Sequence, residues 1–421
     1  MNRSVLAACL GWMFSAVDII LLILFQQDVA DALGVSVQVI KMATGVGLLG
    51  SALGGIVFAQ FGDRYGRVRT LGWCVILYSL ATAGMALSPN AAVLIAMRFL
   101  SGVGTGGEWS VGFALVAEVS PRAGRGTLGG RVAGFFNLGT FLAIILFQAP
   151  LGWRGAFAVM ALPALGVLWL RRNVPESPVW VALQEARRRG DVDPALEARM
   201  RRAPVRLLFR GRMLGLTLRT TLLFTVMNFA FYAFSTTFID YLQSQGGLGL
   251  DKKHQAPYQL VLNLVSLVTT FAAGALSDRI SRRLLYALLC VGGVAGAALF
   301  YLVTHDAGAS VPGGLMAILA LTTMSYGING IIGTITAELF PTHLRSTGPG
   351  FCQNVGKGIG GLAGPIVAGT LVLSHGFPFV LALPGALMLG LALLIWTLPR
   401  VDGRAVAPVE DDGYLTRATT T

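Results

Sequence analysis

The sequence predicts an all-α integral membrane protein whose twelve transmembrane helices form two sets of six. Of its 421 residues, 54% are hydrophobic and only 12% are charged, whereas a soluble domain carries about 25% charged residues. The apolar residues fall into recurring segments, and twelve spans of about 20 residues would occupy about 240 residues. These segments lack the alternating pattern of membrane barrel strands, so helices are the predicted spanning structure.

The first set of spans begins directly at the N-terminus. Its first apolar run continues from Val5 to Gln26, which is longer than the core of a secretory signal, and it contains Asp18. No small-x-small cleavage site follows, so we interpret the run as a membrane span. The six spans of this set are predicted at 5–26, 39–61, 70–88, 91–119, 128–149 and 154–171.

The second set of spans follows a polar stretch. Residues 173–219 carry arginine clusters and proline breaks, which indicates a cytoplasmic linker with short amphipathic helices. The two six-helix halves are therefore predicted at 1–172 and 220–400, and the polar residues 401–421 are expected to form a disordered cytoplasmic tail. The spans of the second half are predicted at 220–243, 257–277, 284–303, 312–338, 346–373 and 376–398.

The distribution of cationic residues predicts the orientation in the membrane. Loops after even-numbered spans carry most of the arginines, whereas the opposite loops carry little more than Lys41, Arg154 and Lys252-Lys253. Because cytoplasmic loops are enriched in Lys and Arg, both termini are predicted to be cytoplasmic. The same pattern explains the net charge of +12 without a nucleic-acid partner. We expect a multi-pass protein of the plasma membrane, the inner membrane in a bacterium, that functions as a monomer in the lipid bilayer.

The sequence contains no recognisable signature of an enzyme or a metal site. Its four cysteines and four histidines lie far apart, without metal-ligand spacing. It has no His-Glu-x-x-His motif, no nucleophile elbow and no sizeable soluble domain. We therefore expect no enzymatic activity, no cofactor and no metal.

Two charged signatures occur twice, about half a chain apart. Residues 63–67 and 278–282 carry an Asp-Arg-x-x-Arg pattern with an offset of 215 residues, and each copy follows the second span of its half. Residues 118–125 and 338–345 carry a Glu-x-x-Pro-x-x-x-Arg pattern with an offset of 220 residues, and each copy ends the fourth span. Parallel six-span repeats joined by a polar linker are a transporter architecture.

This arrangement resembles the major facilitator superfamily over nearly the whole chain. Residues 62–69 are similar to its Gly-x-x-x-Asp-Arg-x-Gly-Arg-Arg loop, although Ala59 replaces the leading glycine and Val68 interrupts the basic pair. Residues 98–109 of span 4 and the Pro-Glu-Ser-Pro-x-Trp segment at 175–180 resemble the sugar-transporter-like branch. Within that branch the chain is most similar to proton symporters for sialate, lactate and related organic acids, or aromatic acids.

The duplicated charges are predicted to form a gate on the cytoplasmic side. A gate needs interactions that are present in only one conformation, and charges at helix ends can pair in one state and separate in the other. Alternatively, these charges only orient solvated loops, since exposed ion pairs contribute about 0–1 kcal/mol each; the duplication favours the gate. The predicted gate residues are Asp63, Arg64, Arg67, Glu118, Arg125, Asp278, Arg279, Arg282, Glu338 and Arg345.

Glycines in span 4 have the spacing of a dinucleotide-binding loop, at Gly102, Gly104 and Gly107. No strand precedes them, so the structural context of such a loop is absent. Small residues four positions apart instead allow helices to approach closely. We expect the pairs Gly50/Gly54 and Gly102/Gly106 to act in this way.

Acids inside the spans point to proton coupling. A charge near the bilayer centre costs at least about 2.5–3.5 kcal/mol, and intramembrane acids commonly take part in proton relays. Asp18 in the middle of span 1 is the first candidate, and Glu108 in span 4 is the second. The resembled families often carry a further acid at the position of Ser15. Asp18 could instead be the structural partner of a cation, and Glu108 could pair with Arg131.

Cations in or near the spans favour an anionic ligand. Lys357 in span 11 shares a helical face with Gln353 and Asn354, and it stands where the resembled families often have arginine. A cation flanked by amide groups suits a carboxylate. Arg98 and Arg131 are two further candidates for the substrate site. Arg98 could also pair with an acid or with carbonyl groups, and Arg131 could extend to the cytoplasmic interface.

Polar and aromatic residues of other spans complete the predicted substrate site. They are Asn137, Asn228, Tyr232, Tyr326 and Asn329. In the resembled superfamily, spans 1, 4, 7 and 10 line the cavity, which favours the last four. Hydrogen bonding between helices is the alternative role for each of them.

Together these features predict a secondary active transporter that moves a small organic acid anion with a proton, by alternating access around a midplane site. The anion would be a monocarboxylate, a sugar acid or an aromatic acid. Protonation of Asp18 and anion binding at Lys357 would favour each other through linkage. The alternatives are a proton-coupled sugar symporter and an exporter of drugs or organic cations. A neutral cargo should tolerate Lys357→Gln far better than an anion.

Overall fold

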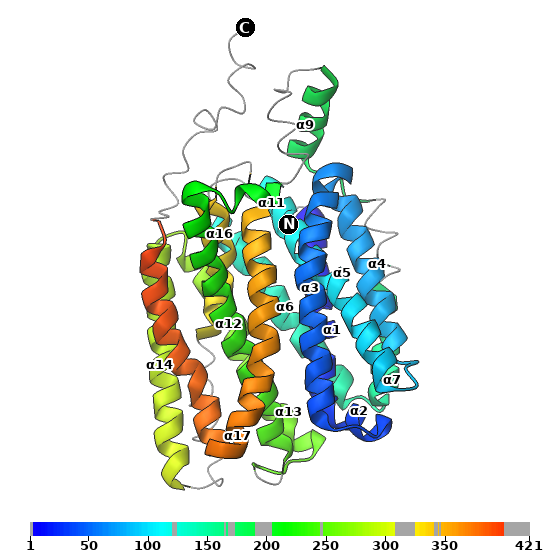
Figure 1. The fold of residues 1–421 in the computed structure, drawn as a ribbon, viewed down its shortest axis with the longest axis vertical. Coiled ribbons are helices and arrows are strands. Elements are labelled where there is room, and N and C mark those ends of the chain that lie inside the picture. The colour runs from blue at the N-terminus through cyan, green and yellow to red at the C-terminus, as the bar shows by residue number, and fades with distance from the viewer. Residues whose placement is uncertain are drawn as a thin grey trace.

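The computed structural model is a bundle of long helices that run between two ends (Figure 1). In the part of the chain that it describes, there is no strand, and eight helices are long and apolar enough to cross a membrane. The upper end in Figure 1 holds the N-terminus, α9 and α11, and the lower end holds α2 and α7. The structure describes residues 3–119, 124–163, 166, 173–189, 204–244, 247–307, 325–340, 344 and 347–399.

The described helices follow the predicted spans in chain order, because each long apolar run can satisfy its backbone groups only as a helix. They are α1 (Arg3–Leu24), α2 (Gln26–Leu33), α3 (Val37–Tyr65), α4 (Arg67–Met85), α5 (Ala91–Val119), α6 (Arg125–Gln148), α7 (Gly152–Val159), α9 (Pro178–Arg189), α11 (Pro204–Leu207), α12 (Gly211–Gln243), α13 (Lys252–Leu276), α14 (Arg282–Ala307), the 3₁₀ helix η1 (Ser325–Ile328), α16 (Asn329–Leu339) and α17 (Thr347–Thr397).

Some element boundaries differ from those of the predicted spans. Helix α12 begins at Gly211 and so extends into the stretch predicted as linker, where α9 and α11 also lie. Helix α17 contains the last two predicted spans, which are separated at Gly376 by a φ of 77°. Glycine adopts this left-handed conformation without strain. Large parts of the sixth and tenth predicted spans, and the predicted tail, lie outside the described residues.

Helices α3 and α5 approach closely because glycines face each other between them. A Cβ atom on Gly54 would lie 1.9 Å from the carbonyl oxygen of Val103, and one on Gly102 would lie 1.9 Å from that of Gly47. The same holds for Gly106, so no larger residue fits at these positions. The predicted small-residue packing is confirmed, and the glycines of span 4 lie inside a helix rather than in a phosphate-binding loop.

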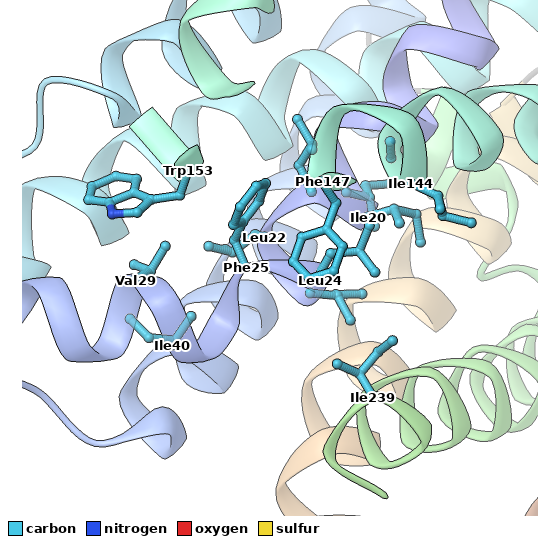
Figure 2. Packing of buried hydrophobic residues seen from close by; sticks show 14 of the residues in the cluster. Ile20, Leu22, Leu24, Phe25, Val29, Ile40, Ile144, Phe147, Trp153 and Ile239 are labelled. Atoms are coloured by element: carbon cyan, nitrogen blue, oxygen red, sulfur yellow. The ribbon is translucent and has the colours of Figure 1, made fainter. Parts of the chain in front are cut away.

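Among the helix pairs that join the first half of the bundle to the second, two make the most extensive contacts. Helix α3 packs against α17, and α6 packs against α13. A cluster of buried apolar side chains also joins the halves near the lower end, where Ile239 of α12 lies near Leu24 of α1 (Figure 2). Large apolar side chains on the outer faces are exposed, among them Leu80, Leu302 and Leu393. Such outer faces suit a hydrocarbon environment.

Candidate functional site

A cavity lies between the two halves of the bundle. Side chains of α1, α5 and α6 form one wall, and side chains of α12, α13, η1, α16 and α17 form the other. The space has a volume of about 900 Å³, open solvent included, within the range of about 300–1,000 Å³ that is usual for small-molecule sites. No group of acidic, histidine or cysteine side chains in the described ranges could hold a metal ion. The polar residues that line the cavity are Asn137, Asn228, Tyr232, Ser266, Tyr326, Asn329, Gln353 and Lys357.

Lys357 of α17 is the charged side chain that lines this cavity. It is only 5% exposed, and it forms no ion pair or hydrogen bond with another described residue. Gln353, one helical turn earlier, also lines the cavity, and its Oε1 atom has no partner among the described residues. Burying an unpaired charge is costly. The ammonium group is therefore suited to a ligand carboxylate, and the Gln353 oxygen can accept a hydrogen bond from a donor on the same ligand.

Asn354, which was predicted to join this group, does not line the cavity. Its amide donates a hydrogen bond to Ser110 Oγ at 2.9 Å, and its side-chain oxygen accepts one from Ser51 Oγ at 3.4 Å. These bonds connect α17 to α5 and α3. Asn354 is thus placed to hold helices together rather than to contact a substrate.

A row of aromatic rings crosses the cavity wall. The ring centroids of Trp12 and Phe136 are 5.4 Å apart, those of Phe136 and Phe231 are 6.3 Å apart, and those of Phe231 and Tyr326 are 5.4 Å apart. Phe136, Phe231 and Tyr326 also line a second cavity that lies nearer the lower end. Tyr326 was predicted for the site, but the other rings were not, because an aromatic residue in an apolar span gives no sign of facing a cavity.

The predicted residues Asn137, Asn228 and Asn329 line the cavity, and their side chains also form hydrogen bonds with helix atoms. The Nδ2 groups of Asn228 and Asn329 donate to carbonyl oxygens of α12 and η1, at 2.8 and 3.1 Å. Asn137 joins α6 to α13, since its Oδ1 accepts from Ser266 and its carbonyl oxygen accepts from Asn263, both at 2.9 Å. Asn137 therefore bonds between helices as well as lining the cavity, whereas the hydrogen bond of Asn228 stays within α12, and substrate contact by these residues stays a prediction.

Asp18 and Arg98 form a buried ion pair away from the cavity lining. Arg98 Nη1 lies 2.9 Å from Asp18 Oδ2, and the two side chains are 1% and 0% exposed. The Ser101 hydroxyl lies 2.8 Å from both carboxylate oxygens, and the Thr82 hydroxyl donates a further hydrogen bond. The structure thus joins the candidate for proton coupling to a candidate for substrate binding. A proton that reached Asp18 would remove the partner of Arg98.

Glu108 is buried in the first half and has no ion-pair partner in the part of the chain that the structure describes. It is 1% exposed and lies against α1, since a Cβ on Gly11 would be 2.7 Å from its Oε1. Its Oε2 has no hydrogen-bond partner within the described residues. It forms no ion pair with Arg131, whose side chain is exposed on α6 and does not line the cavity. Glu108 is therefore free to change its protonation state without breaking a salt bridge.

The duplicated charges at the upper end form two equivalent ion pairs. Arg67 Nη2 lies 3.1 Å from Glu118 Oε1, which joins α4 to α5, and Arg282 pairs with Glu338, which joins α14 to α16. The two arginines are 8% and 5% exposed, so they are not solvated loop charges. Each pair stays within one half. They are therefore placed to brace each half rather than to connect the two.

Asp278 makes a contact between the halves at the upper end. Its carboxylate accepts hydrogen bonds from the backbone N–H groups of Gly126 and Thr127, both at 3.0 Å, and from the Thr127 hydroxyl at 2.8 Å. It caps the N-terminus of α6, where the helix dipole favours a negative charge. This contact must break for the halves to separate at this end.

The other predicted gate residues contribute less to this end of the structure. Arg64 and Arg279 are exposed. The side chains of Asp63 and Arg125, and the whole of Arg345, lie outside the described residues.

A charged contact at the lower end was not predicted. Lys41 of α3 pairs with Asp240 of α12, and Gln26 Nε2 donates to Asp240 Oδ1 at 2.7 Å. Lys41 is 8% exposed. In the sequence, both charges stand at the ends of apolar spans, where they look like ordinary interfacial residues, so nothing in the pattern pairs them.

Comparison with known proteins places this geometry in a family. Residues 6–357 match the model of the Major Facilitator Superfamily. The niacin transporter NiaP of Acinetobacter baylyi is 28% identical over 412 residues, which cover 92% of this chain and 91% of that protein. The sialic acid transporter NanX of Escherichia coli is 24% identical over 372 residues, which cover 87% and 86%. The solved structure of the proton:xylose symporter XylE has a TM-score of 0.74 at 17% identity, over 95% of this chain and 96% of that one.

These matches confirm the predicted fold class, with twelve helices in two six-helix repeats. The family match spans most of the chain and includes both the cavity-lining Lys357 and the Asp18–Arg98 pair. The chain therefore belongs to the major facilitator superfamily, whose members that resemble it are named as transporters.

Proposed function

We propose that the protein is a secondary active transporter that moves a small organic acid anion together with a proton. The observation that carries this proposal is Lys357, a buried cation that faces the cavity and lacks a partner among the described residues. A substrate carboxylate would supply that partner. The relatives named for niacin and sialic acid support the proposal, because both compounds carry a carboxylate.

The balance of buried charge gives proton coupling a physical basis. Lys357 interacts electrostatically with Arg98, Asp18 and Glu108. In their charged forms these two cations and two acids sum to zero. A bound anion leaves a net charge of −1, and one proton on an acid restores neutrality. Since a low dielectric penalises net charge, anion and proton binding favour each other.

Alternating access would use the contacts at the two ends of the bundle. We propose that the halves at 1–172 and 220–400 of a single chain rock around the cavity, in a bacterial inner membrane with both termini cytoplasmic. The cap by Asp278 would then close the cytoplasmic end, and the Lys41–Asp240 pair would close the opposite end. Both contacts are formed in this structure, and in alternating access one of them would break to open each end.

The aromatic row suits a planar or compact acid. Trp12 and Phe231 offer flat apolar surface on either side of Phe136, while Lys357 and Gln353 supply the polar end of the site. A neutral sugar would leave Lys357 without its partner, so the cavity favours an acid over a sugar.

A thermal-shift screen of the purified protein tests this proposal. Nicotinate, benzoate, lactate and N-acetylneuraminate are compared with nicotinamide, benzamide and lactamide, and with neutral sugars. At one hundred times its Kd, a ligand stabilises its target by about 2.7 kcal/mol. We expect at least one acid to raise Tm while its neutral counterpart does not.

Two variants locate the binding charge. Lys357→Gln should lose the shift, whereas Arg131→Gln should keep it, because Arg131 is a cation outside the cavity lining. Equal stabilisation of the wild type and Lys357→Gln by an acid would contradict the assignment of Lys357. Stabilisation by sugars alone would favour the sugar symporter.

A further inference from the structure

Three helices of the first half bury a row of polar side chains that line neither cavity. Each of these side chains is at most 1% exposed. We call this set the inner polar row. It consists of Ser15 and Asp18 of α1, Tyr78, Ser79 and Thr82 of α4, and Arg98, Ser101 and Glu108 of α5.

The two ends of the inner polar row differ in their hydrogen bonding. At one end, Asp18 is bound by Arg98, Ser101 and Thr82. Toward the other end, the Ser15 hydroxyl interacts with the Glu108 carboxylate. Three further polar atoms there, Tyr78 OH, Ser79 Oγ and Glu108 Oε2, have no hydrogen-bond partner in the ranges that the structure describes.

Buried polar atoms without a protein partner, on helices that pack against one another, point to bound water. Buried polar groups are almost always satisfied by protein or by ordered water, and a buried water needs about three polar partners. Hydroxyl groups of two helices and a carboxylate of a third supply such partners here. Water molecules between α1, α4 and α5 would satisfy these groups.

The distance between the two acids of the inner polar row is too long for direct proton transfer, so a bridging group must lie between them. Ser101, which binds Asp18, and Glu108 are seven residues apart on α5, or about 10 Å at 1.5 Å per residue. Direct proton transfer needs a separation near 2.6–3.2 Å, or one bridging water. Tyr78 of α4 packs against Gly104 of α5, which lies between Ser101 and Glu108.

We propose that the inner polar row is a hydrated proton path, and that Glu108 is the group that accepts the symported proton from Asp18. The step moves one proton from the Asp18 carboxyl group to the Glu108 carboxylate through Tyr78, serine hydroxyls and water, with no other bond changed. It restores the charged Asp18–Arg98 pair. The path leads toward the upper end, since α5 runs in that direction. The inference rests on the proposed proton coupling.

The surroundings of Glu108 contain few competing titratable groups. Cys9 of α1, Cys74 and Tyr78 of α4, and Lys357 of α17 interact with it electrostatically. Arg131 interacts with Cys9. Of these groups, the two cations are Lys357, which faces the cavity, and Arg131, which is exposed. Compensation of the Lys357 charge by a bound carboxylate would thus be felt at Glu108.

Infrared titration of the purified full-length protein tests the assignment of Glu108 without any substrate. Between about pH 5 and 8, we expect the wild type to show the carbonyl band of a protonated buried carboxyl group. That band should be lost in the isosteric variant Glu108→Gln, once thermal unfolding shows that the variant is folded. A wild type without the band, or a band that persists in Glu108→Gln, would overturn the assignment.

Transport in proteoliposomes tests the path itself. Radiolabelled nicotinate is the probe, and uptake driven by a pH gradient is compared with exchange in the absence of a gradient. Tyr78→Phe removes one hydroxyl of the path and should slow gradient-driven uptake by roughly tenfold or more, while exchange stays within about twofold. Tyr286→Phe is the matched control, because Tyr286 of α14 is equally buried, also has an unpartnered hydroxyl within the described residues, and lies in the other half.

The outcomes separate this inference from the proposed function. If the gradient drives uptake equally in the wild type, Tyr78→Phe and Glu108→Gln, the path is wrong and symport stands. If wild-type uptake ignores the gradient, proton coupling fails and the path fails with it. A loss that is equal in Tyr78→Phe and Tyr286→Phe would also overturn the path, since it would reflect packing.

Discussion

Arg98 and Lys357 have different partners, although the sequence offers both as binders of an anion. Arg98 is held by Asp18 at 2.9 Å and does not line the cavity, whereas Lys357 lines it without an ion pair among the described residues. The first cation is thus neutralised by the protein, and only the second is left for a ligand. This difference follows from the direction in which each helix faces its neighbours.

The Asp18–Arg98 pair leads to a prediction about stability. Removing one partner of a buried ion pair typically costs about 3–5 kcal/mol, because the other charge remains buried and unpaired. We expect Asp18→Asn to lower the thermal stability of the purified protein strongly. The double variant Asp18→Asn/Arg98→Gln should recover part of that loss. A single variant as stable as the wild type would show that water already satisfies Arg98.

At the residue scale, the sequence is informative about charge and uninformative about pairing. Lys357 and Asp18 are conspicuous in the sequence because a charge in an apolar span is energetically costly and commonly has a function. Nothing in the spacing shows that Asp18 meets Arg98, or that Asn354 bonds to Ser110, since these contacts depend on how α1, α5 and α17 are rotated against one another.

At the element scale, the contact between α3 and α5 depends on glycine. A methyl group on Gly54 would lie 1.9 Å from a backbone carbonyl oxygen, which a real Cβ atom cannot do. We expect Gly54→Ala to destabilise the protein by about 1–3 kcal/mol through overpacking. The measurement is the thermal unfolding of the purified variant.

Gly292 in α14 is the matched control for this experiment. A Cβ there has nothing within 4 Å, and alanine is favoured over glycine in a helix by about 1 kcal/mol. Gly292→Ala should therefore be neutral or slightly stabilising. Equal losses in the two variants would mean that helix–helix contact does not explain the glycines of α3.

The elements themselves are largely predictable, and their junctions are not. Long apolar runs predict α1, α3, α4 and α13 within a few residues. This is because a helix satisfies all its backbone hydrogen bonds internally, as a membrane requires. The pattern cannot show that α12 starts at Gly211, because arginines interrupt the apolar residues there, although Leu216 packs in the buried core. The break at Gly376 likewise depends on local backbone geometry.

At the scale of the whole molecule, contacts at opposite ends of the bundle hold the halves together. Asp278 caps α6 at the upper end, and Asp240 pairs with Lys41 at the lower end. A hydrogen bond to a charged group contributes about 1.5–3 kcal/mol. Removing either charge should therefore shift the balance between conformations about tenfold, in opposite directions.

Accessibility of the cavity from each side of the membrane measures this balance. A cysteine introduced by Asn329→Cys, in the cavity wall, is labelled with an impermeant thiol reagent in vesicles of either orientation. Asp278→Asn should increase labelling from the upper-end side, and Asp240→Asn from the lower-end side. The same change on both sides, or no change, would show that these contacts are not gates.

The repeats in the sequence predict the architecture of the whole molecule but not its gates. The duplicated arginines form pairs inside each half, Arg67 with Glu118 and Arg282 with Glu338. The contacts between halves involve Asp278, which the repeat included, and Lys41 with Asp240, which it did not. A sequence repeat shows only the features that both halves share. A contact that occurs once in the molecule therefore has no second copy in the sequence.

Coupled movement of an anion and a proton is the claim on which this account of the protein depends. The most direct test follows the external pH of proteoliposomes when the acid that stabilises the protein in the thermal-shift screen is added. We expect the medium to become alkaline as the acid enters, and faster in the wild type than in Lys357→Gln or in protein-free liposomes, where the neutral acid crosses by diffusion alone. Entry of the labelled acid into wild-type proteoliposomes with no accompanying change in external pH would contradict the account.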